Sequence, residues 1–417
     1  MSQKILIVAY HYPPVRVSSG IQRTLKFSAY LRDHGWEPLI LTVSPRAYEQ
    51  VSEDQMGEIP ADLVVERAFG LDTSRHLAIK GRYLRVMAQP DRWVSWWPMA
   101  TLRGLQMIRR HRPAAIMATF PIATAHLIGL TLSRLTGVPL IADFRDAMTE
   151  PDYPRDPLTW KVQRRLERAV VKHCKRAVFT TEGTLQMYAE RFPDIPAARW
   201  AVIENGFDEE NFRDAEAGLD RSRLAEAGRM VLVHSGVLYP QERDPRPFFT
   251  ALRELRDAGT IDAGCLKVVL RATGSDDYYR RLLAEFGIEE LVSLEGTIPY
   301  REALREMLRA DGLLLFQAAI CNHQIPAKLY EYARAGQPIL ALTDLAGNTA
   351  AHLRALGCAD VADIADAQSI RRVLEDFLRR WRQGALSGIS PDAAQTCSRR
   401  SRTAELAGLL DGIATRP

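Results

Sequence analysis

Short apolar runs of the kind that form buried strands alternate with helix-like stretches along most of the sequence. Near the start, KILIVAY (4–10) and EPLILTV (37–43) flank the helix-like IQRTLKFSAYLRDHG (21–35). Repetition of this order favours parallel sheets with helices on both faces. The alternation breaks at the polar stretch 206–229, which we interpret as a linker, and it resumes at MVLVHSG (230–236).

A chain of 417 residues is too long for one compact core. With the break, this length predicts an α/β fold of two doubly wound, Rossmann-like domains, at 1–208 and 209–397. A C-terminal helix at about 398–417 could pack back on the first domain. Two such domains would form a cleft, and ligands of open parallel sheets bind beyond the carboxyl ends of the strands.

Cysteine usage and apolar runs indicate the compartment. The five cysteines are scattered and odd in number, which argues for a reducing compartment and against a disulfide framework or a zinc site. The first apolar run is too short for a signal peptide. Residues 113–133 carry no charge, but Pro121 and Gly129 interrupt them, so a strand followed by a helix is favoured over a membrane span. We therefore expect a cytoplasmic protein.

Positive charge is concentrated in the first half. Residues 1–200 hold 28 Lys and Arg against 19 Asp and Glu, whereas 201–417 hold 27 against 32. Part of this positive charge forms a stripe with helical spacing, made of Lys161, Arg165, Arg168, Lys172 and Lys175. Such a stripe is either a solvated helix face or a contact for anionic lipid headgroups or a lipid-linked diphosphate, and the sequence leaves both open. No nucleic-acid-binding module is recognised, so no nucleic-acid partner is expected.

The stretch IPAKLYEYARAGQPILAL (325–342) follows a buried strand, DGLLLFQ (311–317), and begins a helix near Pro326. A helix N-terminus at the carboxyl edge of a sheet attracts anions, because its N–H groups are unpaired and its dipole is positive there. Lys328 adds a positive charge in the first turn, and Glu331 could accept hydrogen bonds from sugar hydroxyls. A nucleoside diphosphate would fit both residues. The alternative is an ordinary surface pair.

The same stretch resembles the donor-binding helix of family 4 retaining glycosyltransferases of the GT-B fold. Residues 10–42, YHYPPVRVSSGIQRTLKFSAYLRDHGWEPLILT, are similar to the opening loop and first helix of that family's bacterial polysaccharide and lipopolysaccharide branch. Further similar segments follow in the family's order: DFRDAM (143–148), IENGFD (203–208), HSGVLYPQERDPRPFFTAL (234–252) and ADGLLLF (310–316).

The resemblance implies a donor site in the second domain. It places the donor ribose at Glu331 and the diphosphate at Arg243 and Lys328, and it makes the loop glycine Gly236 a donor-binding residue. The sequence departs from the family in two places. His323 stands where the family commonly has a first Glu, and the residue after Gly236 is valine rather than arginine. We therefore expect the CNHQ segment (321–324) to contact the donor sugar in place of that Glu.

The resemblance also assigns residues of the first, acceptor-binding domain. Gly20 would approach the phosphates, and His126 falls on the family's active-site histidine. A lone histidine on an apolar helix is otherwise a core residue, and the resemblance favours the active site. In DFRD, we expect a structural role for Asp143 and an acceptor-side role for Asp146. Arg165, Arg168 and Lys172 are candidates for the acceptor or membrane side.

These assignments imply a metal-independent transferase without a cofactor, in which Lys328 and Arg243 stabilise a departing diphosphate. The partners would be a nucleotide-sugar donor, a saccharide or lipid-linked acceptor, and an anionic membrane surface on the cytoplasmic side. Two alternatives stay open. A nucleotide-sugar epimerase can share this architecture, and so can a catalytically inactive carbohydrate-binding partner.

Overall fold

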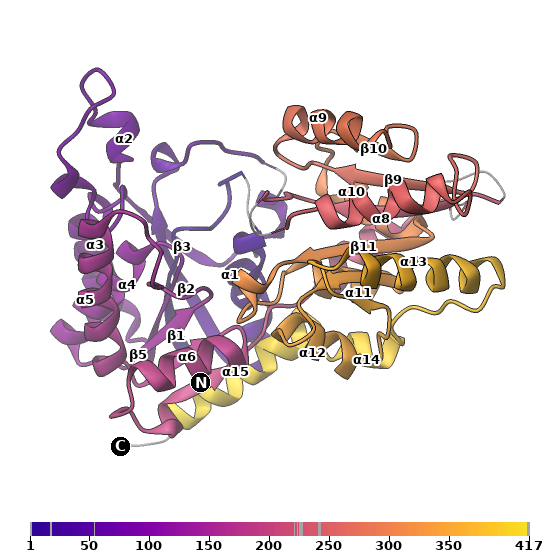
Figure 1. Ribbon diagram of the computed structural model, residues 1–417. Helices are drawn as coiled ribbons and strands as arrows, with labels where there is room; N and C mark the ends of the chain where they lie inside the picture. The colour runs from indigo at the N-terminus through magenta and orange to yellow at the C-terminus, as the bar shows by residue number, and fades with distance from the viewer. Residues whose placement is uncertain are drawn as a thin grey trace. The chain divides into compact units, whose positions relative to one another are not determined.

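The computed structural model describes residues 2–16, 19–53, 55–220, 222, 224, 228–240 and 243–414. The chain forms two compact units (Figure 1). The N-terminal unit comprises residues 1–205 and 399–417, and the C-terminal unit comprises residues 206–398. Each unit is built on one parallel sheet with helices on both faces, as the alternating sequence pattern predicts.

The sheet of the N-terminal unit has seven parallel strands in the order β3-β2-β1-β4-β5-β6-β7. The strands are β1 Gln3–Val8, β2 Trp36–Val43, β3 Val64–Ala68, β4 Ala115–Thr119, β5 Leu140–Phe144, β6 Arg176–Phe179 and β7 Trp200–Val202. The helices are α1 Ser19–Tyr30, α2 Thr73–His76, α3 Trp96–His111, α4 Ala123–Thr136, α5 Pro157–His173, α6 Glu182–Arg191 and α15 Arg399–Ala414.

Alternate residues of this sheet enter two cores. Leu6 and Val8 pack with side chains of α3 to α6, whereas Ile5 and Ile7 pack with those of α1 and α15. This alternation follows from the two-residue period of a strand. Helix α15 is also tied to the sheet by the indole of Trp36, whose Nε1 donates to Asp411 at 2.9 Å. The last helix therefore belongs to the N-terminal unit.

The sheet of the C-terminal unit has six parallel strands in the order β10-β9-β8-β11-β12-β13. The strands are β8 Met230–Ser235, β9 Leu266–Arg271, β10 Val292–Glu295, β11 Gly312–Gln317, β12 Ile339–Thr343 and β13 Val361–Ala362. The helices are α7 Glu209–Glu216, α8 Arg246–Asp257, α9 Asp276–Phe286, α10 Tyr300–Arg309, α11 Lys328–Ala335, α12 Asn348–Ala355, α13 Ala367–Arg382 and α14 Pro391–Gln395.

Strand order reverses once in each sheet, between β1 and β4 and between β8 and β11. At such a switch point the loops leaving the two central strands run in opposite directions, which leaves a crevice at the carboxyl edge of the sheet. Gly20 follows β1, and Gly236 and Lys328 follow β8 and β11. The sheet topology therefore brings the loops that carry these predicted residues to the switch points.

The polar stretch 206–229 differs from its interpretation as a linker. It begins with helix α7, whose N-cap Asp208 accepts a hydrogen bond from the Asn211 N–H. Arg334 of α11 pairs with Glu209 at 2.6 Å and with Glu216 at 3.2 Å. The linker interpretation was therefore wrong for 209–216, because its charges form ion pairs with the C-terminal unit instead of facing only solvent.

Candidate active site

Two loops meet at the switch point of the C-terminal unit. Gly236 follows β8 with φ +108°, a conformation that side chains with a Cβ rarely adopt. A Cβ at this position would lie 3.2 Å from Lys328 Nζ at the start of α11. Glycine therefore lets the backbone after β8 pass close to the Lys328 ammonium.

His234 of β8 holds the same ammonium from the other side. Its ring is fully buried, Nδ1 lies 2.9 Å from the Leu314 carbonyl oxygen, and Nε2 lies 3.1 Å from Lys328 Nζ. A carbonyl oxygen only accepts, so Nδ1 carries the proton and Nε2 is the acceptor. His234 is thus a neutral partner that orients Lys328 without cancelling its charge.

The electrostatics of this pair favour an anion. Burial and the nearby charge of Arg243 lower the pKa of Lys328 well below its ordinary value, although Glu331 opposes the shift. Burial, followed by the charge of Lys328, lowers the pKa of His234 in the same direction. An added negative charge would relieve both effects. These groups can therefore bind a phosphate or another anion.

Arg243 contributes to this positive region. Its Nη1 donates to the Val237 carbonyl at 2.6 Å, and its guanidinium lies 5.3 Å from the centre of the Tyr239 ring. Its buried Nε has no hydrogen-bond partner among the described residues. The side chain is half-buried, so the loop after β8 presents a second cation beside Lys328.

Glu331 lies one helical turn after Lys328, as the sequence predicts. The Tyr300 hydroxyl at the start of α10 donates to its Oε1 at 2.7 Å. The carboxylate is half-buried and is oriented by this hydrogen bond. Such a carboxylate can accept hydrogen bonds from the hydroxyls of a ribose.

His323 lies in the loop between β11 and α11, and the side chain of Gln324 contacts its Nε2 at 3.4 Å. The loop is fixed at Asn322, whose amide donates to Asp344 at 2.8 Å. The Asn348 N–H donates to the Asn322 carbonyl at 2.9 Å. His323 thus has a defined position just before α11, and its contact with a donor sugar stays a prediction.

In the N-terminal unit, Gly20 lies in the first turn of α1, and its carbonyl accepts from Arg145 Nη1 at 2.9 Å. Arg145 is followed by Asp146, which is half-buried. Asp146 favours the charged form of Arg145 against the effect of burial. The structure therefore brings Gly20 and the DFRD segment together, while the acceptor-side role of Asp146 stays a prediction.

His126 and Asp143 lie deeper in this unit. Asp143 pairs with Arg23 at 2.8 Å, both side chains are buried, and the Thr119 hydroxyl donates to Asp143 at 2.9 Å. This confirms the expected structural role of Asp143. The His126 ring has no exposed surface and meets the Phe144 ring edge-on at 4.6 Å, and burial lowers its pKa to about 4.

This position of His126 is that of a core histidine, which is the reading that the residues alone favour. A side chain without exposed surface cannot touch a bound sugar in this conformation. The geometry therefore gives no support to the catalytic assignment of His126 that the family resemblance implies.

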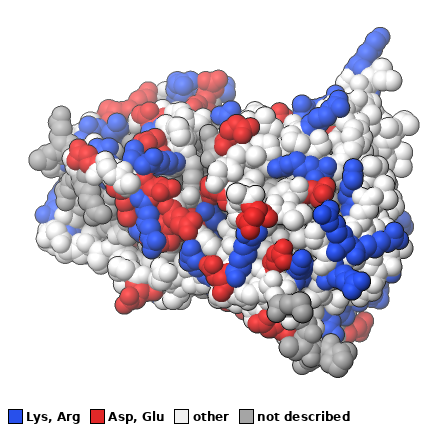
Figure 2. Space-filling model, turned by 180° about the vertical axis from the view of Figure 1, so that it is seen from behind, with Lys and Arg blue, Asp and Glu red and all other residues white. Residues whose placement is uncertain are grey.

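The basic stripe forms on α5 as its spacing predicts, except that Lys175 lies beyond the end of the helix at His173. Arg165, Arg168 and Lys172 are exposed, and Leu166 and Val170 on the opposite face are buried. Lys and Arg side chains are also prominent on the N-terminal unit in the view from behind, at the right of Figure 2. Contact with a membrane stays a prediction. Among the described residues, no helix combines the length and apolar character needed to cross a bilayer.

Residues 20–206 match the family model of the glycosyl transferase 4-like domain. This part of the chain is similar to glycosyl transferase 4-like domains. Among curated proteins, none matches the sequence. The predicted resemblance to glycosyltransferases is confirmed by the family match.

Solved glycosyltransferase structures match both units. Sucrose-phosphate synthase from Thermosynechococcus elongatus is 12% identical with a TM-score of 0.68, and 99% of each chain is covered. HepE from Anabaena, solved with UDP and glucose, is 14% identical with a TM-score of 0.66, covering 98% of this chain and 100% of HepE. WaaG, a glycosyltransferase involved in lipopolysaccharide biosynthesis, is 13% identical with a TM-score of 0.62 and the same coverage. The GT-B fold is thereby confirmed.

Two residues of the candidate site escaped the sequence analysis. His234 stands in the apolar strand MVLVHS two positions before the loop glycine, and a titratable residue in a buried strand is the signal that could have marked it. Tyr300 lies 31 positions before Glu331, and no local pattern links the two. Only the fold brings it to the carboxylate.

Proposed function

We propose that this protein transfers a sugar, with retention of its anomeric configuration, from a nucleoside-diphosphate sugar to a hydroxyl of a saccharide or lipid-linked acceptor. The observation that carries the proposal is the meeting of Lys328 Nζ, neutral His234 and the backbone at Gly236 at a switch point. A diphosphate fits this arrangement because its negative charge would pair with the positive charges of Lys328 and Arg243. Glu331 one turn on would hold the ribose.

The reaction breaks the bond between the anomeric carbon and a diphosphate oxygen and forms a bond to the acceptor oxygen. Lys328 and Arg243 would stabilise the charge that grows on the departing diphosphate, which is the group that most needs stabilisation. We favour attack from the face that the leaving group vacates, with a phosphate oxygen taking the acceptor proton. The scheme requires no metal ion and no nucleophilic side chain.

The comparisons support the substrate classes. HepE contains UDP and glucose, and WaaG acts in lipopolysaccharide biosynthesis. By analogy, the donor here is a nucleotide sugar and the product a cell-surface saccharide. We place the protein in the cytoplasm, at the inner face of the membrane, where the exposed stripe on α5 would meet anionic lipid.

The test is incubation of the protein with a panel of nucleotide sugars and a membrane lipid extract, measuring released nucleoside diphosphate and label transferred to lipid. Transfer from one donor is expected. Glu331→Gln should mainly raise the donor KM, because ribose contacts change little during reaction. Glu302→Gln on neighbouring α10 is the control. Donor conversion without an acceptor would indicate an epimerase, and binding without release an inactive partner.

A further inference from the structure

Loop 77–88, which joins α2 to α3, presents large apolar side chains to solvent. Ile79 is 80% exposed, Val86 70% and Leu84 69%, and Tyr83 and Met87 are exposed as well. The loop projects from the N-terminal unit beside α2 (Figure 1). Single exposed apolar residues are common, but five within nine positions make this segment a candidate interaction surface.

The tip of the loop has a defined backbone. Ile79 and Arg82 exchange two backbone hydrogen bonds, of 2.8 and 3.0 Å, across a two-residue turn. Lys80 and Gly81 between them have φ of 50° and 74°, the pattern of a tight hairpin turn. The Met87 N–H donates to the Leu84 carbonyl at 2.9 Å. Ile79 thus lies in a hairpin turn, and Leu84 begins a second hydrogen-bonded turn that carries Val86 and Met87.

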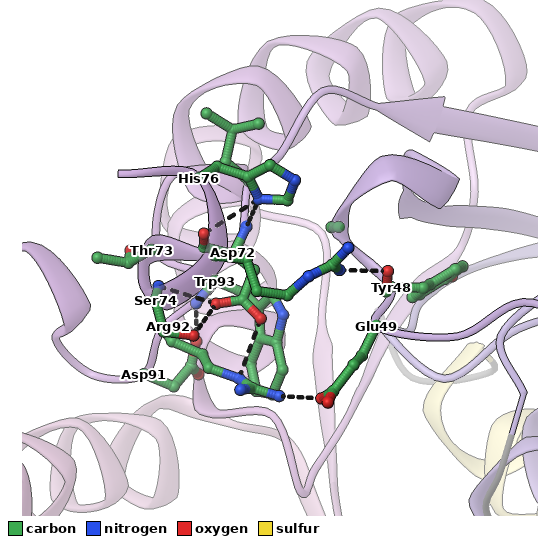
Figure 3. Close-up of polar contacts among 12 residues, drawn as sticks. Tyr48, Glu49, Asp72, Thr73, Ser74, His76, Asp91, Arg92 and Trp93 are labelled. Carbon is green, nitrogen blue, oxygen red and sulfur yellow. Dashed lines mark hydrogen bonds and ion pairs between the residues drawn. The ribbon is translucent and has the colours of Figure 1, made fainter. Parts of the chain in front are cut away.

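The root of the loop is anchored by a polar network (Figure 3). Buried Asp72 caps α2 through the Ser74 N–H at 2.9 Å and pairs with Arg92 Nε at 3.3 Å. Arg92 also contacts Glu49 at 3.3 Å, and its carbonyl accepts from the Thr73 N–H at 2.8 Å. Residues before and after the loop are therefore joined, which holds the apolar tip away from the core.

The charge of this segment is one-sided. Residues 73–90 contain Arg75, Lys80, Arg82 and Arg85 and no Asp or Glu. Exposed apolar side chains among cations suit an anionic lipid bilayer, because its headgroups carry negative charge and its acyl chains beneath them are apolar. A folded protein partner would need acidic groups placed individually against these cations.

The loop adjoins the basic stripe. Gln89 donates to the Thr159 hydroxyl at 2.9 Å in the first turn of α5, and the Gln163 amide donates to the Pro90 carbonyl at 2.9 Å. Arg85 lies 3.3 Å from Asp156, the N-cap of α5. These contacts thus join the segment that follows the apolar tip to α5, the helix that carries the exposed cations.

We propose that loop 77–88 inserts Ile79, Leu84 and Val86 into the interface of an anionic lipid bilayer, with the basic stripe on α5 against the headgroups. The inference specifies how the protein would bind the membrane surface that the proposed function names as a partner. It rests on the proposed function for the choice of that partner. Insertion would give the protein a fixed depth and orientation, which charge attraction alone does not provide.

The experiment is co-sedimentation with vesicles of phosphatidylcholine and phosphatidylglycerol, and with phosphatidylcholine alone. Wild type should bind the anionic vesicles more tightly. Leu84→Ser with Val86→Ser should weaken that binding by about 10-fold or more, since aliphatic burial supplies much of the interfacial affinity. Lys80→Gln should weaken it about fivefold, and more at low than at high salt. Leu135→Ser, which alters an equally exposed leucine at the end of α4, should bind as wild type.

Equal binding by wild type and the Leu84→Ser, Val86→Ser variant would overturn the proposal, as would equal binding to both vesicle types. Self-association that this variant abolishes, in the absence of vesicle binding, would overturn it in favour of a protein interface. Nucleoside-diphosphate release is measured on the same samples without vesicles, with the membrane lipid extract dissolved in detergent as the acceptor source. Normal release with lost vesicle binding separates this inference from the proposed function.

Discussion

The two switch points share a topology and differ in electrostatics. At the N-terminal one, Arg23 of α1 is neutralised by buried Asp143, and Thr119 at the end of β4 completes the contact. At the C-terminal one, Lys328 faces the neutral ring of His234. In the first crevice, the carboxylate of Asp143 balances the charge of Arg23 within the protein. A neutral partner leaves the second crevice with a positive charge that an anion can match.

The difference has an energetic side. The buried Arg23 is compensated within the folded protein by its paired carboxylate, whereas the half-buried Lys328 ammonium has a neutral partner and costs stability until a ligand supplies the charge. Sheet topology thus offers two candidate crevices, and the charge of one partner decides which is suited to phosphate. Four experiments test this contrast between the two crevices.

The largest effect is expected for Asp143→Ala. It would leave Arg23 buried without its carboxylate, which typically costs about 3–5 kcal/mol. Six of the seven tryptophans lie within residues 1–205, so urea unfolding followed by tryptophan fluorescence reports on the N-terminal unit. Lys328→Met is the mirror experiment and should leave the C-terminal unit as stable or more stable. Comparable losses in both variants would refute the contrast.

A slightly smaller effect is expected for Lys328→Ala on catalysis. Turnover should fall roughly 10²–10³-fold, as when other preorganised charges are removed from a developing anion. Lys267→Ala is the matched control, because this half-buried lysine lies near the amino end of β9, at the opposite edge of the sheet. Steady-state kinetics on both folded variants would decide. Wild-type turnover in Lys328→Ala would make the residue an ordinary surface cation.

The sequence predicts much of the fold and the position of the candidate site, and the features that it does not predict have physical causes. The alternating apolar runs predict parallel sheets, and strand-to-helix loops predict where Gly236 and Lys328 lie. The apolar pattern does not indicate the short strand β3, because VVERA carries two charges in five positions. The apolar helix around His126 already indicated a core position, which the family resemblance overrode. The hydrogen bond from Tyr300 to Glu331 is a tertiary contact between distant positions, so no local pattern could predict it.

The third experiment is the pH dependence of UDP binding. The pKa of Lys328 is lowered in the free protein, and a diphosphate favours the ammonium, so binding should take up a proton above that lowered pKa. Affinity should then fall as pH rises through the window between the free and bound pKa, by up to about tenfold per pH unit. Calorimetry in buffers of different ionisation enthalpy measures the uptake.

Lys328→Met is the control for this titration, because it keeps the changes that belong to UDP itself. The same linkage acts on the free protein. Below the ordinary lysine pKa the unfolded chain binds the proton more readily, so stability should rise with pH in that window. An identical pH dependence in wild type and Lys328→Met would exclude this lysine as the titrating group.

The smallest effect is expected for His234→Phe, which tests whether the neutral partner matters. Phenylalanine keeps a ring beside Phe316, whose centre lies 5.2 Å from that of His234, but it removes the acceptor for Lys328. Loss of one oriented hydrogen bond should lower kcat about fivefold with little change in donor KM. His234→Gln, whose side-chain oxygen can replace Nε2, should recover part of the rate. A purely structural role would instead lower the free energy of unfolding in both variants and leave kcat intact, because Lys328 would then find its position without the ring nitrogen.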